Sequence, residues 1–494
     1  MSFESHILTK PRYAGKLEQV SAVCHHLGFF NNVGLTAYYK LPQQSQLLFI
    51  GLRHIIQQAV ASVIRQHPIL FALPVNEYSP SSYFALLPSI DLNKTIQFIQ
   101  RQQDGSQDAS QLPSDPSQRH DEELDHWLEQ EHNKDFKEDY GTLPFWRLVV
   151  LYDPKHTQRF SVTFIYHHAI GDGVTGLIFH DALRAALGNC LAGGEPASST
   201  YSNDGSIVSS DSIPEISLSL EELHPLHAPP PTTDSESDSP PTQWTGGEIR
   251  APLRARWSSI YLRPEISQSF FADCRSKKVS VTSVLSALVT SVVFAKLPQD
   301  VEALTCIIPI NLRPWLDDSY GNPNATMGTY FDAVKVQISR KDQQVGYNAG
   351  DPWEGASVVS EALKKTLTNK SPSGEPYTAV GMFKSIPDLA PLFESLVGNP
   401  RDAAVEFTNV GRFPDPKILD SGAPKETNLG QVLVEKVLVS RSPVVTGAAI
   451  TVTTATGGDG SITVGFSWQN GVIDDGLAES TRREVGEFFH RYST

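Results

Sequence analysis

One long polar segment divides this sequence into two parts that can each fold. Residues 195–243 are rich in serine, proline and acidic residues and poor in apolar ones. Such a segment buries too little apolar surface to offset the entropy lost on ordering it. We therefore expect an N-terminal lobe over residues 1–190, a linker over 191–250 and a C-terminal lobe over 251–494.

Both flanking parts alternate strand-like and helix-like patterns, which is typical of α/β domains with mixed sheets. The strands expected in the first part cover residues 33–41, 145–153 and 160–168, and the helices cover 46–67, 121–136 and 173–187. The second part has expected strands at 255–264, 303–316, 403–413, 431–441, 447–456 and 460–471, and expected helices at 281–297, 377–398 and 474–492. Asp474 or Asp475 is the expected N-cap of the last helix. Residues 103–119 have the composition of a loop.

The composition excludes several classes of protein. The 494 residues carry a formal net charge of −15, whereas proteins that bind nucleic acid by bulk electrostatics are basic. The four cysteines lack the paired spacing of a disulfide framework or a zinc site. No apolar run has the length of a membrane span or of a signal-peptide core. We expect a cytoplasmic monomer with no nucleic-acid or membrane partner.

The stretch "YHHAIGDGVTG", residues 166–176, places two histidines and an aspartate at the end of a strand and before a helix. Side chains at such a corner can converge on a site while rigid elements hold them. His168 can take a proton from a hydroxyl near neutral pH. Gly171 and Gly173 permit a tight bend. The pattern therefore indicates acid–base chemistry at His168.

The residues alone leave two roles open for Asp172. Its carboxylate can orient His168, as in a catalytic triad, or it can turn away and pair with an arginine that locks the loop. Metal binding is a poor fit, because adjacent strand residues such as His167 and His168 point in opposite directions. A buried histidine beside a capping aspartate is the purely structural alternative. We expect a functional site without a metal.

The segment "HHAIGDG" resembles the HHxxxDG signature of the CoA-dependent acyltransferase superfamily, which includes the plant BAHD enzymes and nonribosomal peptide condensation domains. The wider sequence is similar to the fungal alcohol O-acetyltransferase family. The likeness extends to "HHLGFFNNVGLTAYYKL", "RQHPIL", "LPFWRLVVLY", "IPINLRPWL" and "FTNVG". It therefore covers most of the chain outside the linker and the loop at 103–119.

The resemblance implies an α/β fold of two chloramphenicol-acetyltransferase-like lobes, with mixed sheets flanked by helices and an active-site channel between them. Acyl-CoA would enter from one face and the acceptor from the other. His168 would be the general base for direct attack on the thioester, without an acyl-enzyme. Asp172 and Gly173 would be structural, with Asp172 in a salt bridge to Arg313 of "NLRP".

The sequence departs from the BAHD pattern at one point, because it contains no DFGWG motif. The segment "EFTNVG" instead resembles the SNxG-type segment of the fungal branch, with Thr408 in place of serine. Thr408 and Asn409 can donate hydrogen bonds to an oxyanion in the channel. They can equally be a strand end held by its own local bonds.

Three weaker signals remain. Arg275, Lys277 and Lys278 form the densest basic cluster and can meet the phosphates of CoA, although solvated basic loops are common. Arg441 lies between predicted strands and can line the channel or contact CoA. A second histidine pair, His25-His26, has no acidic residue near it in the sequence, and we assign it a structural role.

These features together predict an acyl-CoA-dependent O-acyltransferase, with acetyl-CoA the expected co-substrate and a small-molecule alcohol, such as a fungal specialised metabolite, the expected acceptor. One alternative keeps the site but takes the acyl group from a carrier-protein thioester, as condensation domains do. No carrier domain is recognisable in the sequence, which favours free CoA. Another alternative is a non-catalytic ligand-binding protein on the same fold, since a fold alone does not establish an activity.

Overall fold

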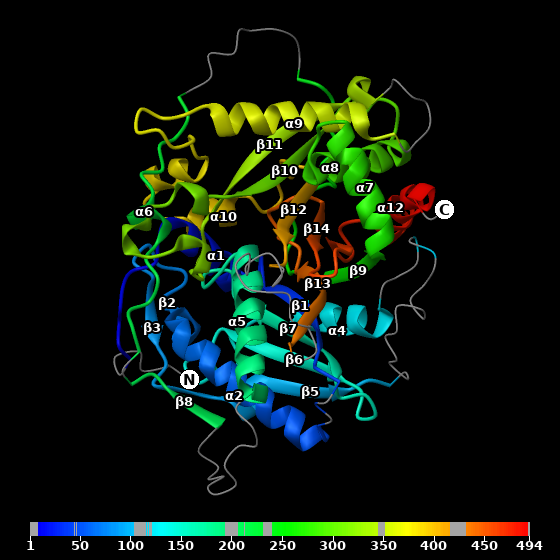
Figure 1. The fold of residues 1–494 in the computed structure, drawn as a ribbon. Helices are drawn as coiled ribbons and strands as arrows, with labels where there is room; N and C mark the ends of the chain where they lie inside the picture. The colour runs from blue at the N-terminus through cyan, green and yellow to red at the C-terminus, as the bar shows by residue number, and fades with distance from the viewer. Residues whose placement is uncertain are drawn as a thin grey trace, which may run out of the picture.

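The computed structural model describes residues 8–43, 45, 47–102, 115, 117, 121–192, 206–211, 213–230, 240–343, 351–414 and 431–492. Two mixed sheets organise these residues, one in each lobe (Figure 1). This is the α/β architecture with mixed sheets that the sequence predicts. Nearly all of the predicted loop at 103–119 lies outside the described residues.

The N-terminal sheet has five strands, in the order β13-β1-β7-β6-β5. All neighbours are antiparallel except β5 and β6. Helices α2 and α5 pack together across one face of this sheet (Figure 1). The strand bounds are β1 Val33–Lys40, β5 Ile96–Gln100, β6 Trp146–Tyr152, β7 Arg159–Tyr166 and β13 Leu433–Arg441.

Strand β13 belongs to the C-terminal half of the sequence but to the N-terminal sheet. It pairs along β1, from Val33 opposite Arg441 to Lys40 opposite Leu433. Figure 1 shows it in orange, beside the blue strand β1. Because β13 ends at Arg441, this pairing carries the Arg441 side chain to the junction of the lobes.

The C-terminal sheet has six strands, in the order β11-β10-β12-β14-β15-β9. Strand β12 is parallel to both of its neighbours, and the other pairs are antiparallel. The bounds are β9 Ala255–Leu262, β10 Ala303–Asn311, β11 Phe331–Ser339, β12 Val405–Arg412, β14 Ile450–Thr456 and β15 Ile462–Gln469. Two small sheets pair β2 (Ala72–Val75) with β3 (Tyr83–Leu86) and β4 (Ser89–Asp91) with β8 (Ile207–Ser209).

The α-helices cover these sheets, and five of them, α2, α4, α5, α8 and α12, lie where the sequence predicts a helix. Helix α2 stops at Gln66, two residues before Pro68, and Asp474 caps the last helix by accepting from the Leu477 amide at 2.7 Å. Their bounds are α1 Lys16–His26, α2 Phe49–Gln66, α3 Leu92–Thr95, α4 Glu122–His132, α5 Gly173–Ala192, α6 Leu220–Leu223, α7 Pro264–Ser276, α8 Val281–Lys296, α9 Trp353–Thr368, α10 Ala390–Ser395 and α12 Asp475–Phe488.

Several stretches differ from the sequence prediction, and helices α7 and α9 and strands β5 and β11 are among the elements that were not expected. The expected helix at 377–398 is a 3-10 helix, Val380–Ser385, followed by the short helix α10. Pro387 and Pro391 explain the break, because proline cannot donate the backbone hydrogen bonds that continue a helix. Helix α1 was not predicted, since its apolar residues follow no clear helical stripe. Within the described residues, no single helix has the length and apolarity to cross a bilayer; α7 and α8 together do, but they are bent by 100° at their junction.

The expectation that the linker cannot order is wrong for part of it. Leu220, Leu223 and Leu226 are buried in a small apolar cluster with Leu17 of α1 and Leu312 of the C-terminal lobe. Four leucines spaced through "SLSLEELHPL" supply enough apolar surface to anchor this segment locally. Residues 193–205, 212 and 231–239 of the predicted linker lie outside the described residues.

Candidate active site

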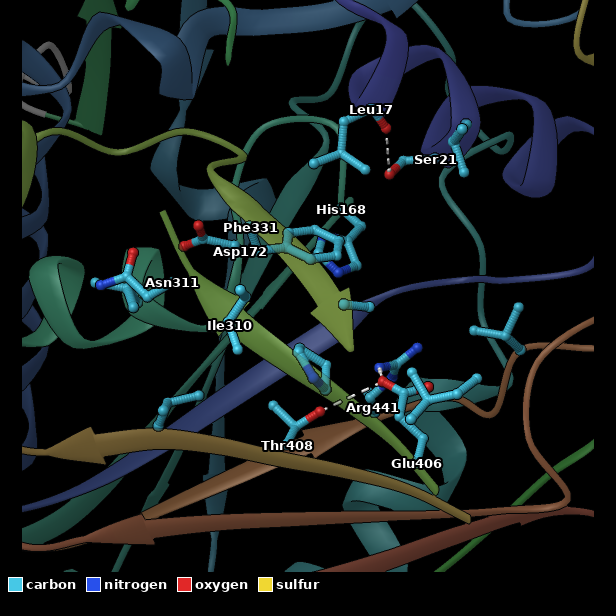
Figure 2. Close-up of a pocket in the computed structure, with 18 of the residues that line it drawn as sticks. Leu17, Ser21, His168, Asp172, Ile310, Asn311, Phe331, Glu406, Thr408 and Arg441 are labelled. Atoms are coloured by element: carbon cyan, nitrogen blue, oxygen red, sulfur yellow. Dashed lines mark hydrogen bonds and ion pairs between the residues drawn. The ribbon is translucent and has the colours of Figure 1, made fainter. Parts of the chain in front are cut away.

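A cavity of about 240 Å³ lies where the two lobes meet (Figure 2). The N-terminal lobe contributes α1, Phe30 and the corner between β7 and α5, and the C-terminal lobe contributes residues of β10, β11 and β12. Of the residues that the sequence singled out, the cavity brings together His168, Asp172, Gly173, Thr408, Asn409 and Arg441. Its other walls are largely aliphatic and aromatic, including Leu17, Val20, Ile310, Phe331 and Val444.

The orientation of His168 is fixed by the loop that it begins. Its Nδ1 lies 2.9 Å from the carbonyl oxygen of Gly171, and a carbonyl can only accept a hydrogen bond. The ring proton therefore sits on Nδ1, and Nε2 keeps its lone pair. The rings of Phe30 and Phe331 flank the imidazole, with centroids 5.6 and 5.2 Å away. The loop thus leaves one basic nitrogen for a ligand in the cavity.

Burial keeps this imidazole neutral. Burial, reinforced by the nearby Arg441 cation, lowers the pKa of His168 to about 4. At neutral pH the side chain is therefore in the form that can accept a proton.

Asp172 locks the corner between β7 and α5 to the C-terminal lobe. Its Oδ2 lies 2.7 Å from Arg313 Nη1 and accepts from the Tyr330 amide at 3.0 Å. Its Oδ1 accepts from the Thr175 amide at 3.0 Å, at the start of α5. Burial alone would raise the pKa of Asp172, but Arg313 and these amides hold the pKa below its usual value. The carboxylate is thus engaged by Arg313 and α5, while the His168 ring is held by Gly171.

Gly173 is required by a close approach between the lobes. A Cβ atom at this position would lie 2.4 Å from Cγ1 of Val410, on β12. A contact that short forces one element to move, so any larger residue would push α5 away from β12. The glycine therefore fixes how near the motif lies to the opposite wall of the cavity.

The local-bond alternative describes the side chains of Thr408 and Asn409. Thr408 Oγ1 donates to Glu406 Oε1 at 3.3 Å. Asn409 Nδ2 donates to Thr282 Oγ1 at 3.0 Å, and its Oδ1 accepts from the Gly411 amide at 2.9 Å. Both residues line the cavity, and both side chains already make hydrogen bonds within the protein.

Sequence reasoning missed the partners of Arg441. Its guanidinium forms a buried ion pair with Glu406 and lies over the Phe30 ring, with Cζ 5.0 Å from the centroid. The signal for Glu406 was a single acid between the apolar residues Val405 and Phe407, which places it on the opposite face of its strand from them. Its pairing with Arg441 depends on how β13 joins the N-terminal sheet, which no local pattern shows.

The basic cluster lies away from the cavity lining. Arg275, Lys277 and Lys278 are exposed at the end of α7 and in the turn before α8, with Lys277 Nζ 5.0 Å from the Trp353 ring centroid. One link to the cavity is present: Thr282, in the first turn of α8, is the residue that binds Asn409. The cluster therefore lies at the end of α7 and in the turn that leads into α8, and it is α8 that contacts the cavity wall.

A second buried group, His25, Glu77 and His167, has the composition of a metal site. His25 has no acidic residue beside it in the sequence, but in the fold its Nδ1 lies 2.9 Å from Glu77 Oε1. The same carboxylate oxygen is 3.4 Å from His167 Nε2. Glu77 is 52 residues from His25 in the sequence, so the pair could not be seen locally.

The backbone around this group favours protons over a metal. The Phe136 amide donates to His25 Nε2 at 3.1 Å, and the Ala169 amide donates to His167 Nδ1 at 3.0 Å. The ring protons therefore sit on the nitrogens that face Glu77. A metal there would force each ring proton against a backbone N–H donor. Burial alone would raise the pKa of Glu77, but the two imidazoles lower it to about 2.

Comparisons with known proteins agree on a family. A sequence model of the alcohol acetyltransferase family matches residues 13–418. The probable alcohol acetyltransferase crmB of Aspergillus fumigatus is 45% identical over 97% of this chain and 99% of its own length. The probable alcohol acetyltransferase FCK4 of Fusarium pseudograminearum is 23% identical over 96% of this chain and 94% of its own length.

Solved structures share the fold at low sequence identity. The trichothecene 15-O-acetyltransferase TRI3 of Fusarium sporotrichioides has a TM-score of 0.66 at 12% identity, and covers 99% of this chain and 96% of its own. The first condensation domain of the calcium-dependent antibiotic synthetase has a TM-score of 0.57 at 13% identity, and covers 98% and 96%. These likenesses confirm the two-lobed fold. The chain is an enzyme of the alcohol acetyltransferase family.

Proposed function

We propose that this enzyme transfers an acetyl group from acetyl-CoA to the hydroxyl of a small, largely apolar alcohol, with His168 as general base. The observation that carries the proposal is the state of His168. Its Nδ1 proton is held by Gly171, its Nε2 is left with a lone pair, and its ring lines the cavity between the lobes.

The chemistry follows from that nitrogen. His168 Nε2 takes the proton of the acceptor hydroxyl as the oxygen attacks the thioester carbonyl carbon. The carbonyl electrons move to oxygen in the tetrahedral intermediate, then return as the carbon–sulfur bond breaks. The departing CoA sulfur takes the proton from the imidazolium, which restores neutral His168. The step needs no acyl-enzyme and no metal.

The cavity walls support an acceptor that is small and mostly apolar. Cavities for drug-sized ligands usually span about 300–1,000 Å³, and this one has about 240 Å³ with largely apolar walls. An apolar alcohol would gain free energy by leaving water for such a surface. A fungal specialised metabolite with one reactive hydroxyl fits this description, and the similarity to fungal acetyltransferases supports it.

The proposal places the phosphates of CoA near Arg275, Lys277 and Lys278. Phosphates are attracted by clustered cations and by the amides at a helix N-terminus, and this cluster directly precedes α8. The surrounding protein is acidic, so a local cationic cluster matters for an anionic donor.

The test is an acetyl-transfer assay with acetyl-CoA and a panel of alcohols and amines, read by mass spectrometry. O-acetylated products and free CoA are expected with the wild-type enzyme, and the His168→Ala variant should lose about 10²–10⁴-fold in rate with little change in Tm. Activity should survive exhaustive chelation. Transfer only from an acetylated carrier protein, and none from acetyl-CoA, would contradict the proposal and favour the condensation-type alternative.

A further inference from the structure

Two buried arginines lie at this site, Arg441 in the cavity lining and Arg313 behind Asp172, and they use their hydrogen-bond donors very differently. Arg313 engages all three guanidinium nitrogens: Nε with Pro323 O, Nη1 with Asp172 and Asn311, and Nη2 with Thr326 O and Gly328 O. The Arg313 side chain therefore has a structural role, because every guanidinium nitrogen already donates to a protein group.

Arg441 is only 8% exposed but is far less engaged. Within the described part of the chain its guanidinium makes one hydrogen bond, from Nη1 to Glu406, and Nε is buried without a partner. A guanidinium has five N–H donors, and leaving them buried and unused costs free energy. Such a group can accept a hydrogen-bond partner from an ordered water or from a ligand.

The position of Arg441 suits the reacting centre. Phe30 is a common neighbour of both groups, since its ring lies 5.6 Å from the His168 ring and 5.0 Å from Arg441 Cζ. Both residues line the same cavity, and Figure 2 shows His168 on one side of it and Arg441, with Glu406, on another. A thioester carbonyl attacked by an alcohol at His168 Nε2 therefore lies within the neighbourhood of the guanidinium.

The other polar side chains of the cavity offer little to an oxyanion. The Ser21 hydroxyl donates to Leu17 O, and Thr408 and Asn409 donate to Glu406 and Thr282. Asn311 keeps an amide group, but it is neutral and exposed, and its oxygen accepts from the Arg313 amide. Arg441 is thus the cationic donor that remains in the cavity lining.

We propose that Arg441 is a catalytic residue that donates hydrogen bonds to the thioester oxygen as it becomes an oxyanion. The inference rests on the proposed acetyl transfer. The charge develops when the hydroxyl oxygen adds to the carbonyl carbon, and it disappears when the carbon–sulfur bond breaks. Preorganised donors at that oxygen lower the barrier without any reorganisation at the moment of reaction. Glu406 and Phe30 hold the guanidinium in place for this role.

A kinetic test must remove the Arg441 cation without leaving the Glu406 carboxylate buried and unpaired. Arg441→Gln alone would leave Glu406 as an unpaired buried carboxylate, so it is combined with Glu406→Gln. The double variant should lose about 10²–10³-fold in kcat, with little change in KM for acetyl-CoA or in Tm. Arg412→Gln, on the exposed end of β12, is the matched control and should keep wild-type rates. A double variant with normal kcat, or with a change confined to KM, would overturn the inference.

A spectroscopic test reads the hydrogen bond without any turnover. The His168→Ala variant is saturated with acetyl-CoA carrying ¹³C at the carbonyl, and the carbonyl stretch is recorded by difference infrared spectroscopy. Polarisation by Arg441 should lower the stretching frequency, and adding Arg441→Gln and Glu406→Gln should return it toward that of free acetyl-CoA. An unchanged band, or a change produced by Asn311→Ala in place of the Arg441 substitution, would contradict the inference.

The two tests separate this inference from the proposed function. If His168→Ala abolishes acetyl transfer while the Arg441 double variant is fully active, the proposed function stands and the role of Arg441 is wrong. If the wild-type protein neither binds acetyl-CoA nor transfers its acetyl group, the proposed function fails, and the inference fails with it.

Discussion

A single backbone carbonyl determines what His168 can do. Because Gly171 O accepts a hydrogen bond from His168 Nδ1, with 2.9 Å between the two atoms, the imidazole presents Nε2 as a base in a fixed ring orientation. The cost of burial acts in the same direction, since a charged imidazole is disfavoured away from water. Tautomer and charge state are therefore both set by the fold before a substrate binds.

The pH dependence of the reaction should report this burial. The pKa of His168 is lowered to about 4, so the neutral base persists as the pH falls below its ordinary value of about 6.5. The plot of kcat/KM against pH should therefore stay flat from neutral pH to about 5 and decline only as the pH approaches about 4. The single Arg441→Gln variant should move this decline to higher pH, because it removes a nearby cation and leaves the Glu406 carboxylate unpaired.

Circular dichroism at each pH is the control for acid unfolding. A decline centred near pH 6.5 in a protein that remains folded would show that His168 is not the buried neutral base described above.

At the scale of elements, the corner between β7 and α5 is held by an ion pair with the opposite lobe. Asp172 joins the start of α5 to Arg313 and to the Tyr330 amide, and Gly173 lets α5 approach β12. The aspartate acts on the position of the corner, while the histidine of the same motif faces the cavity. The motif thus combines the proposed base with the contacts that place it.

A double-mutant cycle on Asp172 and Arg313 should reveal strong coupling. Asp172→Asn leaves a buried guanidinium without its counter-ion, and breaking a buried pair typically costs about 3–5 kcal/mol. Each single variant, Asp172→Asn or Arg313→Ala, should lower Tm and activity together, and the combined variant should lose less than the sum. The exposed pair Lys335 and Asp402 is a matched control that should show little coupling.

The cycle has a clear contrary outcome. The Asp172→Asn variant could instead lose activity at normal Tm, with no coupling between Asp172 and Arg313. In that case Asp172 would be acting on His168 in the manner of a catalytic triad.

The elements that repeat a local pattern were predictable, and the pairs that close over long distances were not. Strand β7 and helix α5 follow from alternating and helical spacing, and the HHxxxDG resemblance gave the Asp172–Arg313 contact. The partners of Arg441 and His25, which are Glu406 and Glu77, depend on how the strands and loops assemble. Sequence spacing contains no information on such contacts, because the strand pairing that creates them is non-local.

Substitutions in the turn between α7 and α8 should affect the binding of acetyl-CoA rather than the rate of acetyl transfer. If Lys277 and Lys278 meet the CoA phosphates, then Lys277→Ala with Lys278→Ala should raise KM for acetyl-CoA and leave kcat nearly unchanged. The effect should shrink as salt increases, because exposed charges are screened. Lys364→Ala with Lys365→Ala, two exposed neighbouring lysines on α9, is the control. An unchanged KM at low salt would remove this cluster from the CoA site.

At the scale of the whole molecule, several segments tie the lobes together, and strand β13 and the segment containing α6 are two of them. Strand β13 crosses from the C-terminal half of the sequence into the N-terminal sheet. The segment containing α6 connects the lobes at a second place, where Leu218 O accepts from the Tyr330 hydroxyl at 2.7 Å and Ser217 O accepts from Arg12 Nε at 2.9 Å. The junction that contains the cavity is therefore held together by segments from different parts of the sequence.

The segment containing α6 makes a final prediction about stability. Leu220 is buried with Leu17, Leu312 and Tyr330, so Leu220→Ala would open a cavity at the junction of the lobes. Substitutions of this kind cost about 2–5 kcal/mol, and the free energy of unfolding measured in urea should fall by that order. Leu48 is 84% exposed, so Leu48→Ala should leave stability nearly unchanged. Because Leu17 also lines the active-site cavity, the Leu220 variant should lose activity at a lower temperature than the Leu48 variant does. Equal stabilities of the two variants would show that this segment is the passive linker that its composition suggests.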